Sequence, residues 1–110
     1  DVYLPFPFIG KWPVVLTRSP YGNPTHTSCA CKQFTHKGFV AAYQDTRGQH
    51  GSEGHFSLFL HDGTDGYDTM DWIKAQKWYD GGIAMQGGSA VGITQLMTAP
   101  LGHPELKAIW

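Results

Sequence analysis

Apolar residues come in short bursts along the chain, separated by turn-rich segments and by stretches with helical spacing. The bursts have the length of buried strands, which in a covered sheet are apolar on both faces. They predict strands at 12–17, 39–44 and 83–86 and the start of a fourth at 106–110. Residues 45–54 carry three glycines and are expected to form a loop.

Helical spacing of apolar residues predicts helices at about 27–37, 66–78 and 90–98. The resulting order, β-α-β-loop-α-β-α-β, is typical of a parallel sheet with helices on both faces. We therefore predict an α/β fold with about four strands and three helices, forming one unit over residues 1–110.

The helix predicted at 66–78 has the clearest pattern. Tyr67, Met70, Ile73 and Trp78 lie near one apolar face, and acidic residues come early and lysines late, as the helix dipole prefers. We expect Asp65 to cap its N-terminus and the glycine pair 81–82 to end it. In the same way, Gly38 is expected to end the preceding helix.

Charge is scarce in this chain of 110 residues. Charged residues make up 15% of it, against about 25% in an average globular protein. A sheet of four strands would also leave an edge and part of a face uncovered. We expect the chain to be a fragment of a larger protein, with a truncated and inactive gene product as the alternative.

The charge balance and the cysteines limit the classes of partner. Eight Lys and Arg against nine Asp and Glu give a net charge of −1, so we expect no nucleic-acid binding. No apolar run approaches the roughly 20 residues of a membrane span, so no membrane partner is expected.

Cys29 and Cys31, with His26 and His36 nearby, permit a metal site but lack the usual zinc spacing. Two thiols in a helix are the alternative, and we predict neither metal nor cofactor. The compartment stays open, leaning towards the cytoplasm because the C-x-C pair fits reduced thiols.

The glycine-rich turn QGGSAVG at 86–92 is the sharpest chemical feature of the sequence. It places Ser89 between small residues at a predicted strand-to-helix turn, as a nucleophile elbow requires. Gly87 and Gly92 would avoid steric clashes there, and the backbone N–H of Ala90 would be the first oxyanion donor. Two other interpretations remain open, a simple helix cap and a phosphate-binding loop.

Four stretches resemble, in order and spacing, the cocaine esterase and X-prolyl dipeptidyl-peptidase family of α/β-hydrolases, which includes the α-amino-acid ester hydrolases. They are PVVLTRSPYG (13–22), GFVAAYQDTRGQHGSEGHF (38–56), DGYDTMDWIKAQKWYDGG (65–82) and MQGGSAVGITQ (85–95). The resemblance implies the N-terminal portion of a catalytic domain. One position departs from the family pattern, because Ala90 stands where an aromatic residue is common.

The resemblance implies roles for three residues. Ser89 would be the nucleophile, and Tyr21 would join the N–H of Ala90 in the oxyanion hole through its phenol. From the residues alone, Tyr21 reads more simply as a loop aromatic packed on a neighbour. Asp45 and Arg47 are expected to form a charge pair that holds the loop.

A serine nucleophile also needs a base and an orienting acid, which follow it in this fold as Asp or Glu and then His. After Ser89 only His103 and Glu105 remain, in the opposite order, and we expect His103 to be a solvated loop residue. His50, in the glycine-rich loop, is a minor candidate base. The resemblance thus implies a serine hydrolase that is catalytically incomplete over these residues.

The implied activity is cleavage of acyl esters, amino-acid esters or X-prolyl peptides through an acyl-enzyme at Ser89. The expected partners are a small ester or peptide substrate, together with the rest of a parent chain or a second copy. The alternative is a non-catalytic, hydrolase-derived core that packs against or binds another protein. The sequence does not choose among the substrates.

Overall fold

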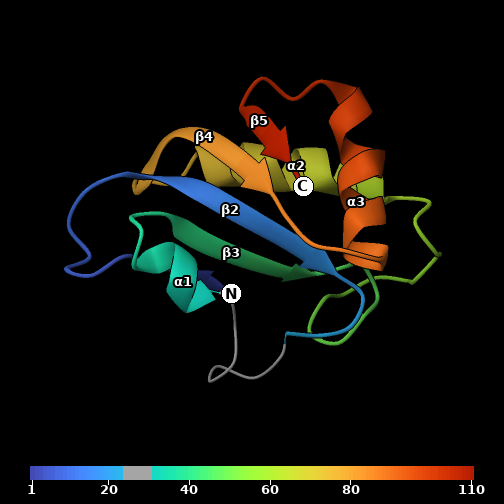
Figure 1. The fold of residues 1–110 in the computed structure, drawn as a ribbon. Helices are drawn as coiled ribbons and strands as arrows, with labels where there is room; N and C mark the ends of the chain where they lie inside the picture. Colours follow the sequence, from blue (N-terminus) through green and yellow to red (C-terminus); the bar gives the residue numbers. More distant parts are fainter. Residues whose placement is uncertain (24–30) are drawn as a thin grey trace.

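Five strands form a single mixed sheet in the part of the chain that the computed structural model describes, residues 1–23 and 31–110 (Figure 1). They are β1 (Val2–Tyr3), β2 (Trp12–Ser19), β3 (Val40–Asp45), β4 (Tyr79–Met85) and β5 (Leu106–Ile109). Their order in the sheet is β1-β3-β2-β4-β5, in which β2 to β5 pair in parallel and β1 pairs antiparallel with β3. The predicted parallel α/β core is confirmed, whereas the short β1 was not predicted.

Helices lie on both sides of the sheet, α1 in front of it and α2 behind it in the view of Figure 1. They are α1 (Cys31–Thr35), α2 (Asp62–Lys74) and α3 (Ala90–Thr98), which runs into a 3₁₀ turn, η1 (Ala99–Leu101). The first four positions predicted for the helix at 27–37 lie outside the described residues. Within the described ranges, no helix combines the length and apolar character needed to cross a membrane.

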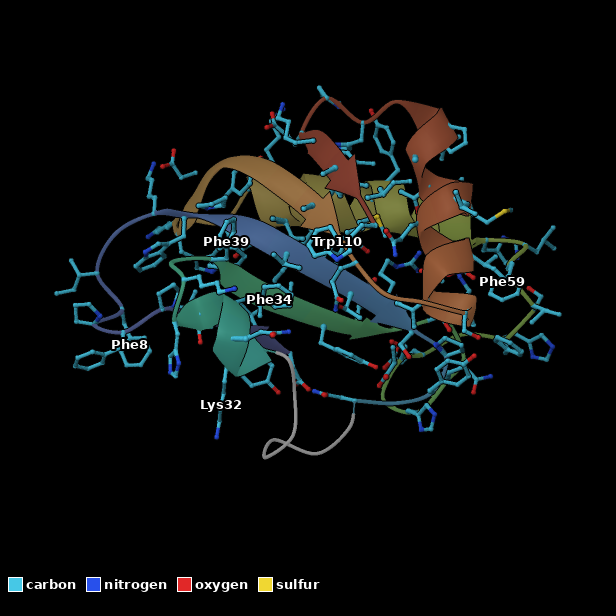
Figure 2. All side chains as sticks on the ribbon, in the orientation of Figure 1. Phe8, Lys32, Phe34, Phe39, Phe59 and Trp110 are labelled. Atoms are coloured by element: carbon cyan, nitrogen blue, oxygen red, sulfur yellow. The ribbon has the colours of Figure 1, made fainter. Side chains whose placement is uncertain are left out.

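The main core fills the space between the sheet and α2. Alternate residues of the three central strands point to this side, as the two-residue period of a strand dictates. The fully or almost fully buried members are Val14, Leu16, Val40, Ala42, Ile83 and Met85 of the sheet and Met70 and Ile73 of α2. Of the four predicted apolar positions, Met70 and Ile73 are therefore confirmed as buried in α2, Tyr67 is half-buried, and Trp78 packs against the core from beyond the end of the helix. On the other side, the rings of Phe34 and Trp110 lie 6.5 Å apart (Figure 2).

The boundaries of α2 differ from the prediction at both ends. The helix runs over 62–74 instead of 66–78, and its N-cap is His61, so Asp65 lies inside the first turn and does not cap it. The N-terminal part of α2 holds two glycines, which lie at the contact with α3. A Cβ at Gly63 would lie 2.7 Å from the Met97 carbonyl oxygen, and one at Gly66 would lie 2.2 Å from Thr98 Oγ1. Close helix packing therefore explains these glycines.

The glycine pair 81–82 lies inside β4 and does not end a helix, which corrects a second expectation. Strand β4 pairs Tyr79 with Trp12 and Ile83 with Val14, so the register shifts between these two pairs. Gly81, with φ of 55°, lies in this irregular segment. By contrast, Gly38 adopts a φ of 82° after α1, as predicted for the residue that ends this helix.

Candidate active site

The turn between β4 and α3 holds Ser89 in a sparsely populated backbone conformation. Its φ is 60° and its ψ is −132°, a strained geometry that costs about 1–3 kcal/mol for a residue other than glycine. The turn is fixed on both sides, because Gly92 N and Ile93 N donate to the Ser89 carbonyl at 2.9 and 3.1 Å. Gln95 Nε2 donates to the Gly87 carbonyl at 2.9 Å. The strained strand-to-helix turn predicted from the sequence is present.

Two glycines make this turn sterically feasible. A Cβ at Gly87 would lie 2.3 Å from Val91 Cγ1, and the residue has φ of 133°. A Cβ at Gly92 would lie 3.3 Å from the Gly87 carbonyl oxygen, a tight contact. The predicted steric role of both glycines is confirmed.

The Ser89 hydroxyl contacts the phenol of Tyr21. The distance from Ser89 Oγ to Tyr21 Oη is 3.2 Å, whereas Ser89 makes no side-chain hydrogen bond that caps α3. Ser89 therefore stands at the N-cap position of α3, but its side chain does not cap the helix. Tyr21 follows β2 and Ser89 follows β4, and these strands are parallel neighbours, so their carboxyl ends meet at one edge of the sheet. As the first residue of α3, Ala90 carries an N–H with no intrahelical acceptor.

The loop that carries Tyr21 is held by polar contacts. Tyr21 N donates to Ser19 Oγ at 3.0 Å, and Tyr43 Oη donates to the Gly22 carbonyl at 2.8 Å. Burial raises the pKa of Tyr43, so this donor stays protonated. The His50 ring lies against Gly22, where a Cβ would be 3.0 Å from His50 Nδ1. His50 thus lies beside the candidate site, although within the described residues no hydrogen bond joins it to Ser89.

Sequence reasoning missed Arg18, a buried cation at the end of β2. The residue is 1% exposed, and its Nη1 donates to the Asp62 carbonyl at 2.6 Å and lies 3.2 Å from Asp62 Oδ1. Burial lowers the pKa of Arg18 and raises that of Asp62, and in each case the charge of the partner opposes the shift. The available signal was an arginine directly after the apolar strand predicted at 12–17, because a buried charge needs partners.

The expected pair of Asp45 and Arg47 does not form. Arg47 instead makes a bidentate contact with Asp65 in the first turn of α2, and this hydrogen bonding lowers the pKa of the Asp65 carboxyl. Asp45 Oδ2 accepts from Gly51 N at 3.1 Å. The loop is therefore held by two separate carboxylates, one binding its backbone and one binding Arg47.

His103 is buried, which corrects the expectation of a solvated loop residue. It is 3% exposed, its Nε2 lies 3.2 Å from Asp71 Oδ1, and its Nδ1 accepts from Glu105 N at 3.1 Å. The ring also packs edge-on against Tyr67, with centroids 4.5 Å apart. His103 follows the far end of α3 from Ser89 and serves the packing of α2.

The described residues contain no cluster of three or more His, Cys, Asp or Glu side chains that would hold a metal ion. Of the residues considered for such a site, His26 and Cys29 lie outside the described ranges. An open cavity of about 560 Å³ lies between β3 and α2, next to Arg47 and Trp72, but Ser89 and Tyr21 do not line it.

Comparison with known proteins decides the family. The family model described as X-Pro dipeptidyl-peptidase (S15 family) matches residues 1–110. The chain belongs to this family. The S15 chain is 39% identical over 105 residues to cocaine esterase from Rhodococcus sp. (strain MB1 Bresler), covering 91% of the chain. Its relatives are hydrolases, and the resemblance stated from the sequence is confirmed.

Solved structures of S15 relatives share the fold. A CocE/NonD family hydrolase from Staphylococcus aureus matches 98% of the chain with a TM-score of 0.87 and 25% identity. An α-amino acid ester hydrolase matches 98% of it with a TM-score of 0.85 and 30% identity. The chain spans 18% of the length of cocaine esterase and 23% and 21% of these two structures. It thus corresponds to a small part of each relative.

Proposed function

We propose that the chain is the nucleophile-bearing part of a serine hydrolase that cleaves esters or amides through an acyl-enzyme at Ser89. The observation that carries the proposal is the strained Ser89, whose hydroxyl does not cap α3 and lies 3.2 Å from Tyr21 Oη. Backbone strain of this kind persists where the surrounding structure enforces it, and it concentrates at functional sites.

In this mechanism Ser89 Oγ attacks the substrate carbonyl carbon and passes its proton to a base. The electron pair of the C=O bond moves to the oxygen, and the resulting oxyanion accepts hydrogen bonds from Ala90 N–H and Tyr21 O–H. Collapse of this intermediate expels the alcohol or amine, which takes the proton from the base, and leaves the acyl group on Ser89. Water then gives a proton to the same base and attacks the acyl carbon, the bond between this carbon and Ser89 Oγ breaks, and Oγ recovers the proton as the acid leaves.

The base and its orienting acid are proposed to come from outside residues 1–110. Among the described residues, His103 is engaged with Asp71 and Glu105 beyond the far end of α3, and His50 makes no hydrogen bond to Ser89. The rest of a longer chain would complete the triad. This proposal is supported by the relatives, which are more than four times as long as the matched part.

The substrate class follows from the relatives by name. They are called a cocaine esterase, an α-amino acid ester hydrolase and an X-Pro dipeptidyl-peptidase, so we propose an acyl ester, an amino-acid ester or an X-prolyl peptide for this chain. Ala90 presents only a methyl group beside the nucleophile. It would leave more room there than an aromatic side chain.

The test is covalent labelling with a fluorophosphonate ester, followed by intact mass, on residues 1–110 and on the gene product at its natural length. We expect one adduct on the natural-length protein, no adduct in Ser89→Ala, and an unchanged adduct in the matched control Ser57→Ala. Tyr21→Phe should slow labelling about 100-fold, because it removes one oxyanion donor. Residues 1–110 alone should react far more slowly.

The outcomes separate the parts of the proposal. An adduct that persists in Ser89→Ala would overturn the nucleophile assignment. Equal rates for 1–110 and the natural-length protein would place the base within these residues or in a second copy of them. No adduct at natural length would favour the non-catalytic core.

A further inference from the structure

The buried Arg18 makes directional contacts with three different elements. Its Nη1 donates to the Asp62 carbonyl at the start of α2, and its Nε donates to Gln44 Oε1 of β3 at 2.7 Å. Its own carbonyl accepts from Thr94 Oγ1 of α3 at 3.0 Å. The acceptor Gln44 Oε1 is also bound by Thr69 Oγ1 of α2 at 2.9 Å. The end of β2 is therefore tied to β3, α2 and α3 at a single residue.

A polar connection between the two halves of the candidate site runs through this residue. On one side, Ser19 follows Arg18 and its Oγ accepts from Tyr21 N at 3.0 Å. On the other side, Thr94 lies on the same short helix that begins just after Ser89. A shift of the end of β2 relative to α3 would thus change the distance between Tyr21 Oη and Ser89 Oγ.

We propose that Arg18 is a positioning residue that holds Tyr21 against Ser89: its side chain fixes the end of β2 to α2 and β3, at the residue whose backbone carbonyl meets α3. The inference rests on the proposed function in one respect, because it takes the contact between Tyr21 and Ser89 as the oxyanion-hole geometry. Arg18 itself touches neither the nucleophile nor the phenol and acts through the backbone on either side.

Arginine suits this position because its planar guanidinium directs several N–H donors at fixed angles. Here Nε and Nη1 reach acceptors on two different elements. Stability alone does not require a charge here, because replacing a buried ion pair with apolar residues of similar volume often keeps or raises the free energy of unfolding. That property also supplies a test, because the pair of Arg18 and Asp62 can be replaced together.

The experiment compares Arg18→Met/Asp62→Leu with the native chain by NMR, using tyrosine labelled with ¹³C at Cζ. Tyr21→Phe identifies the Tyr21 signal among the five tyrosines. In the native background, Ser89→Ala should shift this signal, because it removes the partner of the phenol. In the Arg18→Met/Asp62→Leu background, Ser89→Ala should leave the signal in place, because the contact is already lost.

Two controls separate positioning from stability. Ile73→Val, in the buried core of α2, should lower the free energy of unfolding yet keep the shift caused by Ser89→Ala. Arg18→Lys should behave like the double variant in this assay, because one ammonium cannot reproduce two directed donors at separate nitrogens. Arg18→Met alone leaves the buried Asp62 unpaired and can fail to fold, which is why the double variant carries the test.

Each outcome has a distinct meaning. An equal shift of the Tyr21 signal in both backgrounds would overturn the positioning role of Arg18 and leave the proposed function intact. No shift in the native background would overturn the contact between Tyr21 and Ser89, and with it the oxyanion role of Tyr21. In the natural-length protein, the rate penalty of Tyr21→Phe should fall from about 100-fold to less than about tenfold in the double variant.

Discussion

Gly87 and Gly88 are neighbours in the sequence, but the backbone requires only the first of them. A Cβ at Gly87 would lie 2.3 Å from Val91 Cγ1 at φ of 133°, whereas a Cβ at Gly88 meets nothing within 4 Å. We expect Gly87→Ala to lower the free energy of unfolding by about 2 kcal/mol and Gly88→Ala to change it by less than about 0.5 kcal/mol. Urea unfolding measures both, and equal effects would contradict the elbow geometry.

The ion pair of Arg47 and Asp65 makes stability depend on pH in the acid range. Hydrogen bonding to Arg47 lowers the pKa of Asp65 in the folded chain, so this contribution is complete above the unfolded pKa of about 3.9. It is lost as pH falls through the folded value. The stability of the native chain should therefore fall more steeply between pH 6 and pH 2 than that of Arg47→Gln, and the two curves should converge at the acid end.

Lys11→Gln is the matched control for this titration, because Lys11 is an exposed cation on a different loop. Its stability curve should run parallel to that of the native chain across the same pH range. If the native chain and Arg47→Gln kept a constant difference down to pH 2, Asp65 would not be the titrating group.

At the residue scale, the local part of the site was predictable and the distant part was not. Ser89 and the neighbouring glycines carry their signal within seven consecutive residues, because strain, small side chains and a following helix coincide there. The partner of Arg18 lies 44 residues away and that of His103 lies 32 residues away. No local pattern encodes such pairs, so a buried arginine and a buried histidine were read as ordinary positions.

At the scale of elements, the two glycines of α2 show why its boundaries were misplaced. The prediction began this helix at residue 66 with Asp65 as its cap, but the helix starts at residue 62, and Gly63 and Gly66 bring α2 and α3 close together. Conversely, the apolar strands were predicted well, because burial on both faces leaves a continuous apolar run. Strand β1 has only two residues and is paired antiparallel, so it carries no comparable pattern.

The contact between Gly66 and Thr98 is the element-scale prediction. A Cβ at Gly66 would lie 2.2 Å from Thr98 Oγ1 and 2.8 Å from its Cγ2. Gly66→Ala should therefore destabilise the chain by about 1–3 kcal/mol in the native background. The cost should be smaller in a Thr98→Ala background, where both clashing atoms are absent.

A double-mutant cycle in urea measures this coupling between the two helices. If the losses of unfolding free energy caused by Gly66→Ala and Thr98→Ala were additive, the two helices would not be in contact at this pair of residues. Thr98→Ala alone should also cost stability, because Thr98 Oγ1 lies in hydrogen-bond contact with the carbonyls of Asp62 and Thr94.

At the scale of the whole molecule, apolar side chains stay exposed on α3 and the turn after it. Ile93, Met97 and Leu101 recur at helical spacing, and Leu96 adjoins them with 64% exposure. Trp110, on the other side of the sheet near Phe34, is also exposed (Figure 2). Together with the low charge of the chain, these exposed apolar side chains favour a contact with another protein surface.

We expect residues 1–110 alone to self-associate through the exposed face of α3. Leu96→Lys with Leu101→Lys should shift sedimentation towards the monomer, because two charges would have to be buried in the contact. The matched control is Leu60→Lys, since Leu60 is 72% exposed on the loop before α2. It should leave association unchanged. Association that survives the two α3 substitutions but disappears in Leu60→Lys would move the contact to that loop.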